Sequence, residues 1–253
     1  MSRTSGERPV ALVTGASRGI GAATARELAR RGYALALAAR SAEALEALAA
    51  ELSATTPAVA LATDLAEPAQ VSRLAELVLE RFGRVDSLIN NAAIGGNNRV
   101  VARMDDAYVR EILAINLEAQ IALTRLLLPG MLERRRGAIV FVDSVAGHIA
   151  FPASTIYSAT KFGLRGFAVG LRRELRGTGV SVSIVSPGFI DTDMTRWLRR
   201  FPKAPPALVG RVIADALVRP RREVFTPRIY RAAVWLERWL PWLADATLSR
   251  RGR

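Results

Sequence analysis

The chain has 253 residues, of which 50% are hydrophobic and 23% charged, a balance that supports one sizeable globular core and excludes a mainly disordered chain. It has no cysteine, which excludes disulfides, thiolate metal sites and cysteine nucleophiles, and its one histidine, His148, excludes a histidine-rich metal site. The formal net charge is +13, and every basic residue except Lys161 and Lys203 is arginine, which fits a codon-usage bias as well as a preference for anions.

Short apolar runs alternate with longer amphipathic stretches along the chain. The predicted strands are Val10–Thr14, Ala34–Ala39, Ala58–Thr63, Ser87–Asn90, Ala138–Val142 and Val180–Val185, with a late one near Glu223–Thr226. The predicted helices are Ala22–Arg31, Ala42–Leu52, Val71–Phe82, Ala107–Leu128 and Thr160–Arg176. Continuous apolar strands that alternate with helices are typical of a parallel sheet buried on both faces. We therefore expect an α/β protein with a doubly wound parallel sheet in a single domain, without a secretory signal or a transmembrane helix.

A glycine-rich segment follows the first predicted strand and leads into the first helix. It comprises Thr14, Gly15, Ala16, Ser17, Arg18, Gly19, Ile20 and Gly21. Glycine permits the sharp turn and the close approach of a pyrophosphate to the backbone, and the first N–H groups of the helix then face the phosphates. The segment predicts a nucleotide-binding site at the carboxyl end of the first strand.

The spacing of these glycines, with Thr14 before them, resembles the classical short-chain dehydrogenase/reductase family, and further matches follow in order from about Pro9 to Met194. The resemblance implies a Rossmann-type fold that binds a nicotinamide cofactor. It assigns to the cofactor the residues Asp64, Leu65, Asn91, Ala92 and Ala93 near the adenosine, and Pro187, Gly188, Ile190 and Thr192 near the nicotinamide. The family has glycine where this chain has Ala93, which we expect to adjust the fit of the cofactor without abolishing its binding.

The end of the second predicted strand indicates which cofactor is bound. NAD sites usually place a carboxylate there for the ribose hydroxyls, but this chain has Ala39, Arg40 and Ser41. The guanidinium of Arg40 can pair with a 2′-phosphate, Ser41 can add a hydrogen bond, and Arg18 can approach from the glycine-rich turn. The sequence therefore predicts NADP(H).

Tyr157 and Lys161 are four residues apart, which places them on one face of a helix. The resemblance adds Ser144 and Asn116 and completes a catalytic tetrad. We expect Tyr157 to exchange a proton with the substrate, and the Lys161 ammonium to lower the pKa of the phenol. In the family, the lysine also binds the nicotinamide ribose. Ser144 would bind the substrate oxygen, and Asn116 would hold a water that links Lys161 to solvent.

The loop 191–206 is expected to close over the substrate and to contribute Met194, Trp197, Leu198 and Phe201. These apolar side chains favour a lipophilic substrate. His148 is placed at the rim of the pocket, with a structural role preferred over catalysis, and Asp143 is expected to be hydrogen-bonded beside the end of its strand. No metal site is expected.

Together these features predict an NADP(H)-dependent carbonyl reductase or alcohol dehydrogenase in residues 1–226. A non-catalytic NADP(H)-binding sensor or scaffold is the alternative, although all four catalytic positions are filled. We expect a cytoplasmic homo-oligomer, dimer or tetramer, that does not bind nucleic acid.

Residues 227–253 form a basic, tryptophan-rich tail, predicted as an amphipathic helix. Trp235, Trp239 and Trp242 lie on one helical face if Pro241 only bends the helix. Tryptophan beside arginine is typical of a helix that lies peripherally at a membrane. The alternative is that the same face packs on the domain or on a partner subunit, and we prefer this packing role over a membrane role.

Overall fold

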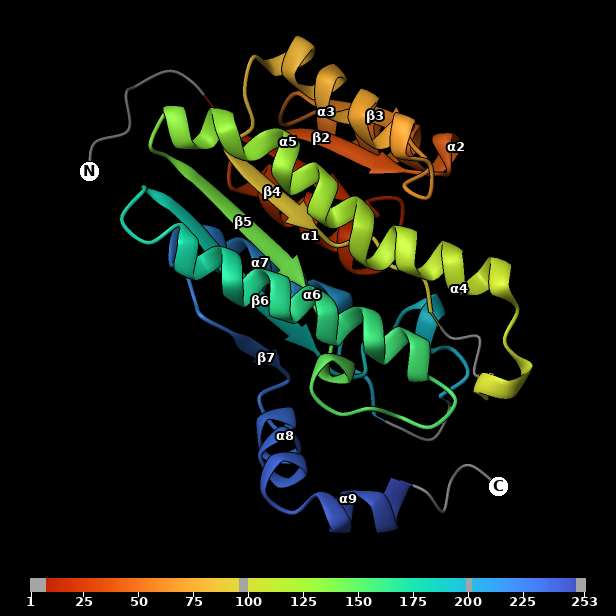
Figure 1. Cartoon of the computed structure of the whole chain (residues 1–253). Helices are drawn as coiled ribbons and strands as arrows, with labels where there is room; N and C mark the ends of the chain where they lie inside the picture. Colours follow the sequence, from red (N-terminus) through yellow and green to blue (C-terminus); the bar gives the residue numbers. More distant parts are fainter. Residues whose placement is uncertain (1–7, 96–99, 199–201, 249–253) are drawn as a thin grey trace.

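The computed structural model describes residues 8–95, 100–198 and 202–248. Within them lies a seven-stranded, fully parallel sheet with strand order β3-β2-β1-β4-β5-β6-β7 (Figure 1). The strands are β1 (Val10–Thr14), β2 (Ala34–Ala39), β3 (Ala58–Ala62), β4 (Ser87–Asn90), β5 (Gly137–Val142), β6 (Val180–Pro187) and β7 (Val224–Thr226). The doubly wound sheet predicted from the sequence is thereby confirmed, with strand ends within two residues of the prediction.

Helices cover both faces of the sheet (Figure 1). Helices α1 (Gly19–Arg30), α2 (Ala42–Ser53) and α7 (Pro206–Val218) pack on one face, and α3 (Pro68–Phe82), α5 (Ala119–Glu133) and α6 (Thr155–Glu174) pack on the other. Along β1, Ala11 and Val13 belong to the first core and Leu12 to the second. Because side chains of a strand point alternately to the two faces, a strand with a helical layer on each side is apolar at every position.

The strand order reverses between β1 and β4. The chain moves outwards from β1 through β2 to β3, and then returns to the other side of β1 for β4. The pairs Val13↔Leu37 and Val13↔Ile89 keep these three strands in register, so their carboxyl ends meet at one edge. A reversal of this kind opens a crevice at the carboxyl edge, where doubly wound proteins bind ligands.

The long helix predicted over Ala107–Leu128 is interrupted. The structure has α4 (Asp106–Leu113), a π-helical segment (Ala114–Glu118) and then α5, which continues past Pro129 to Glu133. The insertion places Asn116 inside the fold, where its side chain bonds to the backbone of Ile94. Such a segment has the apolar periodicity of its neighbours, so the sequence pattern does not reveal it.

The whole stretch Asp106–Glu133 is long and apolar enough, by length and composition, to cross a membrane. In this fold its buried residues belong to the core beneath α3 and the sheet. The stretch therefore packs as part of the core.

Helices α6 and α7 and the tail also differ from the prediction. Helix α6 begins at Thr155 rather than Thr160 and so includes Tyr157, while α7 was not predicted.

The tail forms two helices, α8 (Tyr230–Trp239) and α9 (Pro241–Leu248), because Leu240 leaves the helical region with φ −134° and ψ 57°. Proline lacks the N–H that would continue α8, so Pro241 ends the helix instead of bending it. In Figure 1 the two helices, here called the C-terminal arm, extend away from the layered body. Single 3₁₀ turns lie at Val101–Arg103, Val145–Gly147 and Asp193–Thr195.

Candidate active site

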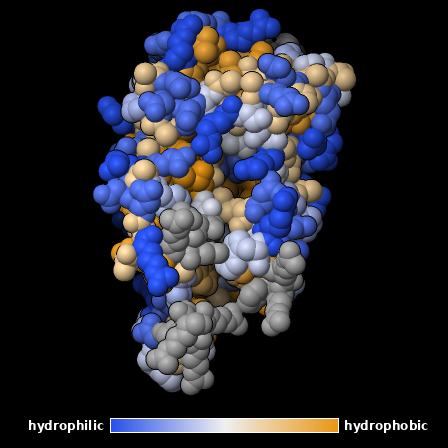
Figure 2. All heavy atoms as spheres, turned by 90° about the vertical axis from the view of Figure 1, so that its right-hand side faces the viewer, coloured by the Kyte–Doolittle hydropathy of each residue, from blue (hydrophilic) through white to orange (hydrophobic). Residues whose placement is uncertain are grey.

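An open cavity of about 1400 Å³ lies at the carboxyl edge of the sheet. Figure 2 views the molecule from this side, where hydrophilic side chains surround a hollowed, partly apolar region. Most residues predicted from the sequence line this cavity: Gly15, Ser17, Arg18, Gly19, Ile20, Arg40, Ser41, Asp64, Leu65, Asn91, Ala92, Ala93, Tyr157, Lys161, Thr192 and Met194. Residues more than 170 positions apart in sequence are thus brought to one site.

The glycine-rich turn is shaped by close backbone contacts. Gly15 has a φ of +65°, and a Cβ there would lie 2.9 Å from the Cα of Ala92. A Cβ on Gly21 would lie 2.1 Å from the carbonyl oxygen of Gly15, so α1 could not begin this close to the turn with any other residue. Within the described chain, no side chain caps α1 and no acidic residue lies in its first turn. The positive end of the helix therefore faces the cavity unneutralised, as binding of a phosphate requires.

Thr14 braces the turn from below rather than lining the cavity. Its Oγ1 accepts hydrogen bonds from the backbone N–H groups of Asn91 and Ala92, each at 3.0 Å, and donates to the carbonyl of Ile89. The Asn91 side chain returns a hydrogen bond to the carbonyl oxygen of Thr14 at 2.8 Å. These contacts tie the ends of β1 and β4 together across the crevice.

The two arginines proposed for a 2′-phosphate, Arg18 and Arg40, both line the cavity. Arg40 Nη1 lies 3.1 Å from Glu111 Oε1, and Arg18 Nη1 lies 3.0 Å from Asp193 Oδ2. Both guanidinium groups are largely exposed and can exchange these partners for a phosphate. Ser41 caps α2, because its Oγ accepts from Ala44 N at 3.4 Å, so this helix also begins at the cavity wall.

Lys161 is almost fully buried at the floor of the cavity. Its Nζ donates to the carbonyl oxygen of Val142 at 2.9 Å and lies 5.9 Å from the centroid of the Tyr157 ring. Burial lowers the pKa of Lys161 to about 8, and the neighbouring carboxylate of Asp143 opposes this shift. The ammonium is therefore held in place, and it loses its proton more readily than a lysine in solution.

The pKa of Tyr157 is shifted in the direction opposite to the one expected from the sequence. Burial raises the pKa of Tyr157 to about 12, a hydrogen bond with Ser144 acts to lower it, and the negative charge of Asp143 raises it further. In this state Lys161 contacts a backbone carbonyl instead of the phenol oxygen, so the expected lowering is not seen. At neutral pH the phenol is protonated and can donate to a substrate oxygen.

Two members of the tetrad lie around this pair without being part of the cavity lining. Ser144 acts on the pKa of the nearby Tyr157 phenol, and its hydroxyl accepts a hydrogen bond from Ala146 N at 3.0 Å. The amide of Asn116 accepts from Ile94 N at 2.8 Å and donates to Ile94 O at 2.9 Å and to Thr160 Oγ1 at 3.2 Å. Both donors of Asn116 are thus used by protein groups, and its side chain braces the segment after β4.

The other predicted site residues lie further from the chemistry. The lining of the cavity does not include Pro187, Gly188, Ile190 or Gly21. Trp197 is 53% exposed, and its indole N–H donates to the carbonyl of Met194. His148 is not at the pocket rim as predicted, because its ring turns inward to Glu223. Phe201, predicted as part of the lid, lies outside the described residues.

Several cavity-lining residues were not assigned to the site from the sequence, and one of them, Asp143, is adjacent in the chain to a proposed catalytic residue. Asp143, which precedes Ser144, lines the cavity together with Lys161 and is 4% exposed. Its contacts reach Glu223 at the start of β7, a residue that no motif pointed to. In the sequence, the only indication was that the carboxylate of Asp143 directly precedes the predicted catalytic Ser144.

Comparisons with known proteins agree with this geometry. Residues 9–203 match the family model described as short chain dehydrogenase. The 3-oxoacyl-[acyl-carrier-protein] reductase FabG of Escherichia coli (strain K12) is 38% identical over 192 residues, which cover 76% of this chain and 78% of the relative. Dehydrogenase/reductase SDR family member 7B of Bos taurus is 37% identical over 193 residues, 74% of this chain and 59% of the relative.

Solved structures show the same fold. A metagenomic short-chain oxidoreductase in complex with NADP has a TM-score of 0.77 and 35% sequence identity, and the match covers 86% of this chain and 96% of that one. A short chain dehydrogenase/reductase from Burkholderia phymatum in complex with NAD has a TM-score of 0.86 and 27% identity, and covers 98% of this chain and 97% of that one. The second match is long enough to include the C-terminal arm.

Proposed function

The chain belongs to the classical short-chain dehydrogenase/reductase family of oxidoreductases, and we propose that it interconverts a carbonyl and an alcohol using NADP(H). The observation that carries the proposal is that a protonated phenol and a buried ammonium line one end of a cavity whose other end fits a nucleotide, with the hydroxyl of Ser144 close behind the phenol. NADPH, when bound, supplies the hydride.

The proposed catalytic residues each perform a step that the geometry allows. Ser144 lies close enough to the Tyr157 phenol to influence its pKa, so a carbonyl oxygen that enters between the two hydroxyls would accept hydrogen bonds from both. Tyr157 donates its proton to the oxygen as negative charge develops there, and Ser144 stabilises that charge. Lys161, which donates to the Val142 carbonyl, would hold the ribose hydroxyls of a bound cofactor, and Asn116 fixes the segment after β4.

The charge at the adenosine end supports NADP(H) rather than NAD(H). Arg40 and Arg18 face the cavity where NAD-binding relatives of this fold place a carboxylate, and the first turn of α2 adds its positive dipole end. One similar solved structure contains NADP and another contains NAD, so the proposed preference for NADP(H) depends on the two arginines.

A lipophilic carbonyl is the proposed substrate. Met194 and Ile94 lie beside Tyr157 in the cavity wall, and Leu198 in the same loop is only 9% exposed. Several relatives are named as 3-oxoacyl-[acyl-carrier-protein] reductases, so a 3-oxoacyl thioester is a specific candidate within this class.

The test is oxidation of NADPH, and separately of NADH, with a panel of apolar aldehydes, ketones and 3-oxoacyl thioesters. We expect turnover with NADPH and an apolar ketone or ketoester, and much weaker turnover with NADH. Tight binding of NADPH with no turnover on any carbonyl would favour the alternative of a sensor or scaffold. No binding of either cofactor would reject the proposal.

We further propose that residues 1–226 form the catalytic domain and that the C-terminal arm packs on a second copy of the chain. Tyr230 anchors the arm, because its ring lies against Gly188 and its hydroxyl accepts from Phe189 N at 3.3 Å. Beyond this anchor Trp235, Trp239 and Trp242 are 62%, 61% and 65% exposed. A fold match that continues through the arm in another protein supports a shared structural role for it, and a homo-oligomer covers this apolar area.

A further inference from the structure

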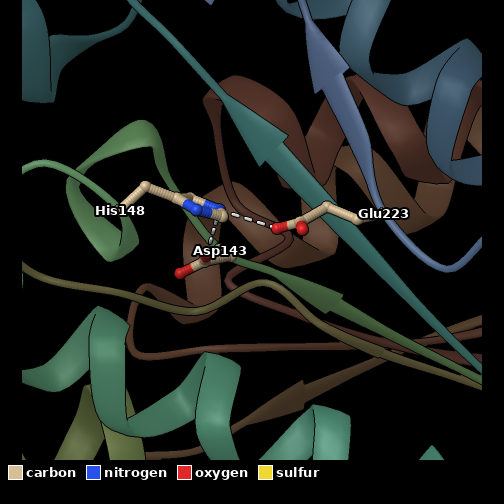
Figure 3. A group of neighbouring side chains, drawn as sticks. All are labelled: Asp143, His148 and Glu223. Atoms are coloured by element: carbon tan, nitrogen blue, oxygen red, sulfur yellow. Dashed lines mark hydrogen bonds and ion pairs between the residues drawn. The ribbon is translucent and has the colours of Figure 1, made fainter. Parts of the chain in front are cut away.

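The carboxylate of Glu223, which directly precedes β7, is the centre of a polar cluster behind the proposed catalytic residues (Figure 3). Nε2 of His148 lies 2.7 Å from Glu223 Oε1, and the hydroxyl of Ser186 in β6 lies 3.1 Å from the same oxygen. Arg165 of α6 donates from Nε to Oε1 at 3.2 Å and from Nη2 to Oε2 at 3.4 Å. The Glu223 side chain is only 17% exposed, so these contacts are stronger than those of a surface ion pair.

The contact with His148 fixes the turn that begins at Ser144. Ser144 caps the 3₁₀ turn Val145–Gly147, because its Oγ accepts from Ala146 N at 3.0 Å. His148 closes the other end of the turn, where its N–H donates to the carbonyl oxygen of Val145 at 3.0 Å. Ser144 and His148 therefore lie at the two ends of one short turn, and a contact that holds the His148 ring also holds the turn.

The contact with Arg165 reaches the helix that carries the other catalytic groups. Tyr157, Lys161 and Arg165 are spaced by four residues along α6, so they lie on one face of the helix. The first two line the cavity, and the third binds Glu223. One carboxylate therefore connects the turn of Ser144 with the helix of Tyr157.

The pair of carboxylates, Asp143 and Glu223, beside the imidazole of His148 also has the composition of a metal site. Burial acts to raise the pKa of Glu223, but hydrogen bonds with His148 and Arg165 outweigh burial and hold the pKa at about 2. Glu223 thus stays charged with a guanidinium as its partner, and a divalent ion would have to bind beside that positive charge. The cluster is therefore better described as a link between elements.

We propose that Glu223 is a positioning residue that holds the turn of Ser144 against the helix of Tyr157, so that both hydroxyls face the same substrate oxygen. The inference rests on the proposed function, which gives Ser144 and Tyr157 their roles. Among the described residues, Glu223 is not part of the cavity lining, so it acts on the reaction through His148 and Arg165 rather than by touching the cofactor.

Glu223→Ala removes both links at once. We expect turnover of NADPH with a carbonyl that the wild type reduces to fall by about 10- to 100-fold, because a misplacement of about 1 Å in an active site has an effect of this size. The affinity for NADPH, measured by calorimetric titration, should stay close to that of the wild type. Glu223→Gln keeps an oxygen that can bond to His148 and should recover part of the turnover.

Hydrogen–deuterium exchange of the full-length protein reports on the turn itself. The amides of Ala146, Gly147 and His148 all bond within the turn, so mass spectrometry over residues 144–149 should show faster exchange in Glu223→Ala. This measurement needs neither cofactor nor substrate.

Asp86→Ala is the matched control for both measurements. Asp86 directly precedes β4, and its side chain, mostly buried like that of Glu223, bonds to Val10 N at 2.8 Å and to Arg84 at 3.1 Å. Its removal should lower the stability of the fold but leave the turnover of the folded protein and the exchange over residues 144–149 unchanged. A general loss of stability acts in both variants, whereas a loss of position acts only in Glu223→Ala.

Slower turnover together with faster exchange in Glu223→Ala, and neither in Asp86→Ala, is the expected result. Unchanged turnover, or slower turnover without faster exchange, would overturn the proposal. If Glu223→Ala does not fold, His148→Ala and Arg165→Met decide, because each breaks one of the two links. Each should slow turnover, and the double variant should lose little more than the slower single variant, whereas losses that multiply would contradict a single bridge.

The two kinds of readout also separate this inference from the proposed function. A wild type that binds NADPH but reduces no carbonyl would reject the function. Faster exchange in Glu223→Ala would then still show that Glu223 holds the turn, and unchanged exchange would reject that link as well.

Discussion

At the residue scale, Arg40 decides between the two cofactors. Arg40→Asp removes the partner of the 2′-phosphate and places a negative charge beside it. We expect KM for NADPH to rise at least about tenfold, which is about 1.4 kcal/mol, with little change for NADH. Steady-state kinetics with both cofactors measure the ratio.

Two variants make this measurement specific. Arg26 lines the same cavity but is bound to Glu51 by two hydrogen bonds of 2.7 Å, so Arg26→Gln should leave the ratio of the two cofactors unchanged. Glu111→Gln releases Arg40 from its ion pair and should not weaken the binding of NADPH. Equal use of NADPH and NADH by the wild type would refute the cofactor assignment.

The sequence was sufficient for some site residues and insufficient for others, for physical reasons. Tyr157 and Lys161 are four apart on one helix, so their spacing alone places them together. His148 and Glu223 are 75 residues apart and meet only because β6 carries β7 to the edge of the sheet. The side-chain direction of His148 was decided by that distant carboxylate, and no local pattern contains it.

At the scale of elements, strand positions follow from continuous apolar runs and were predicted almost to the residue. The helices were less predictable where tertiary contacts override periodicity. The π-helical segment at Ala114–Glu118 contains Asn116, which bonds to Ile94, 22 residues earlier, a contact that the local pattern does not reveal. The arm breaks at Leu240 because Pro241 ends α8, and the sequence alone left open whether this proline bends or ends the helix.

The junction of β6 with α8 gives a prediction at this scale. A Cβ on Gly188 would lie 2.0 Å from the Tyr230 ring, so Gly188→Ala must displace the ring. We expect a loss of about 1–3 kcal/mol in the free energy of unfolding, measured with urea. The same substitution in a Tyr230→Ala background should cost much less, because the space is then free.

Gly166→Ala provides the control for this double-mutant cycle. Gly166 lies within α6, and nothing lies within 4 Å of an added Cβ, so alanine should be neutral or stabilise by up to about 1 kcal/mol. Equal costs of Gly188→Ala in the two backgrounds would show that the arm does not dock through Tyr230.

At the scale of the whole molecule, the exposed tryptophans of the arm predict self-association. Changing Trp235, Trp239 and Trp242 together to Gln keeps the anchor at Tyr230 and removes the apolar area. We expect the wild type to be a dimer or tetramer by light scattering, and the triple variant, like a chain that ends at Thr226, to be smaller. Trp197→Gln removes another exposed tryptophan outside the arm and should leave the assembly unchanged.

Co-sedimentation with anionic vesicles tests whether the arm binds a membrane surface instead of a second copy of the chain. Sedimentation of the wild type but not of the triple variant, with no change of assembly, would assign the arm to a membrane surface instead. An unchanged oligomer and no sedimentation would leave both proposals for the arm refuted.

The central claim is that Tyr157 supplies the proton for reduction of a carbonyl by NADPH, and Tyr157→Phe tests it most directly. The variant retains the ring and loses only the hydroxyl, so calorimetric titration should give nearly the wild-type affinity for NADPH. Turnover of a substrate from the panel should fall by about 10²–10⁴-fold, the usual contribution of a general acid. Turnover within a few-fold of wild type, with affinity for NADPH unchanged, would contradict the account.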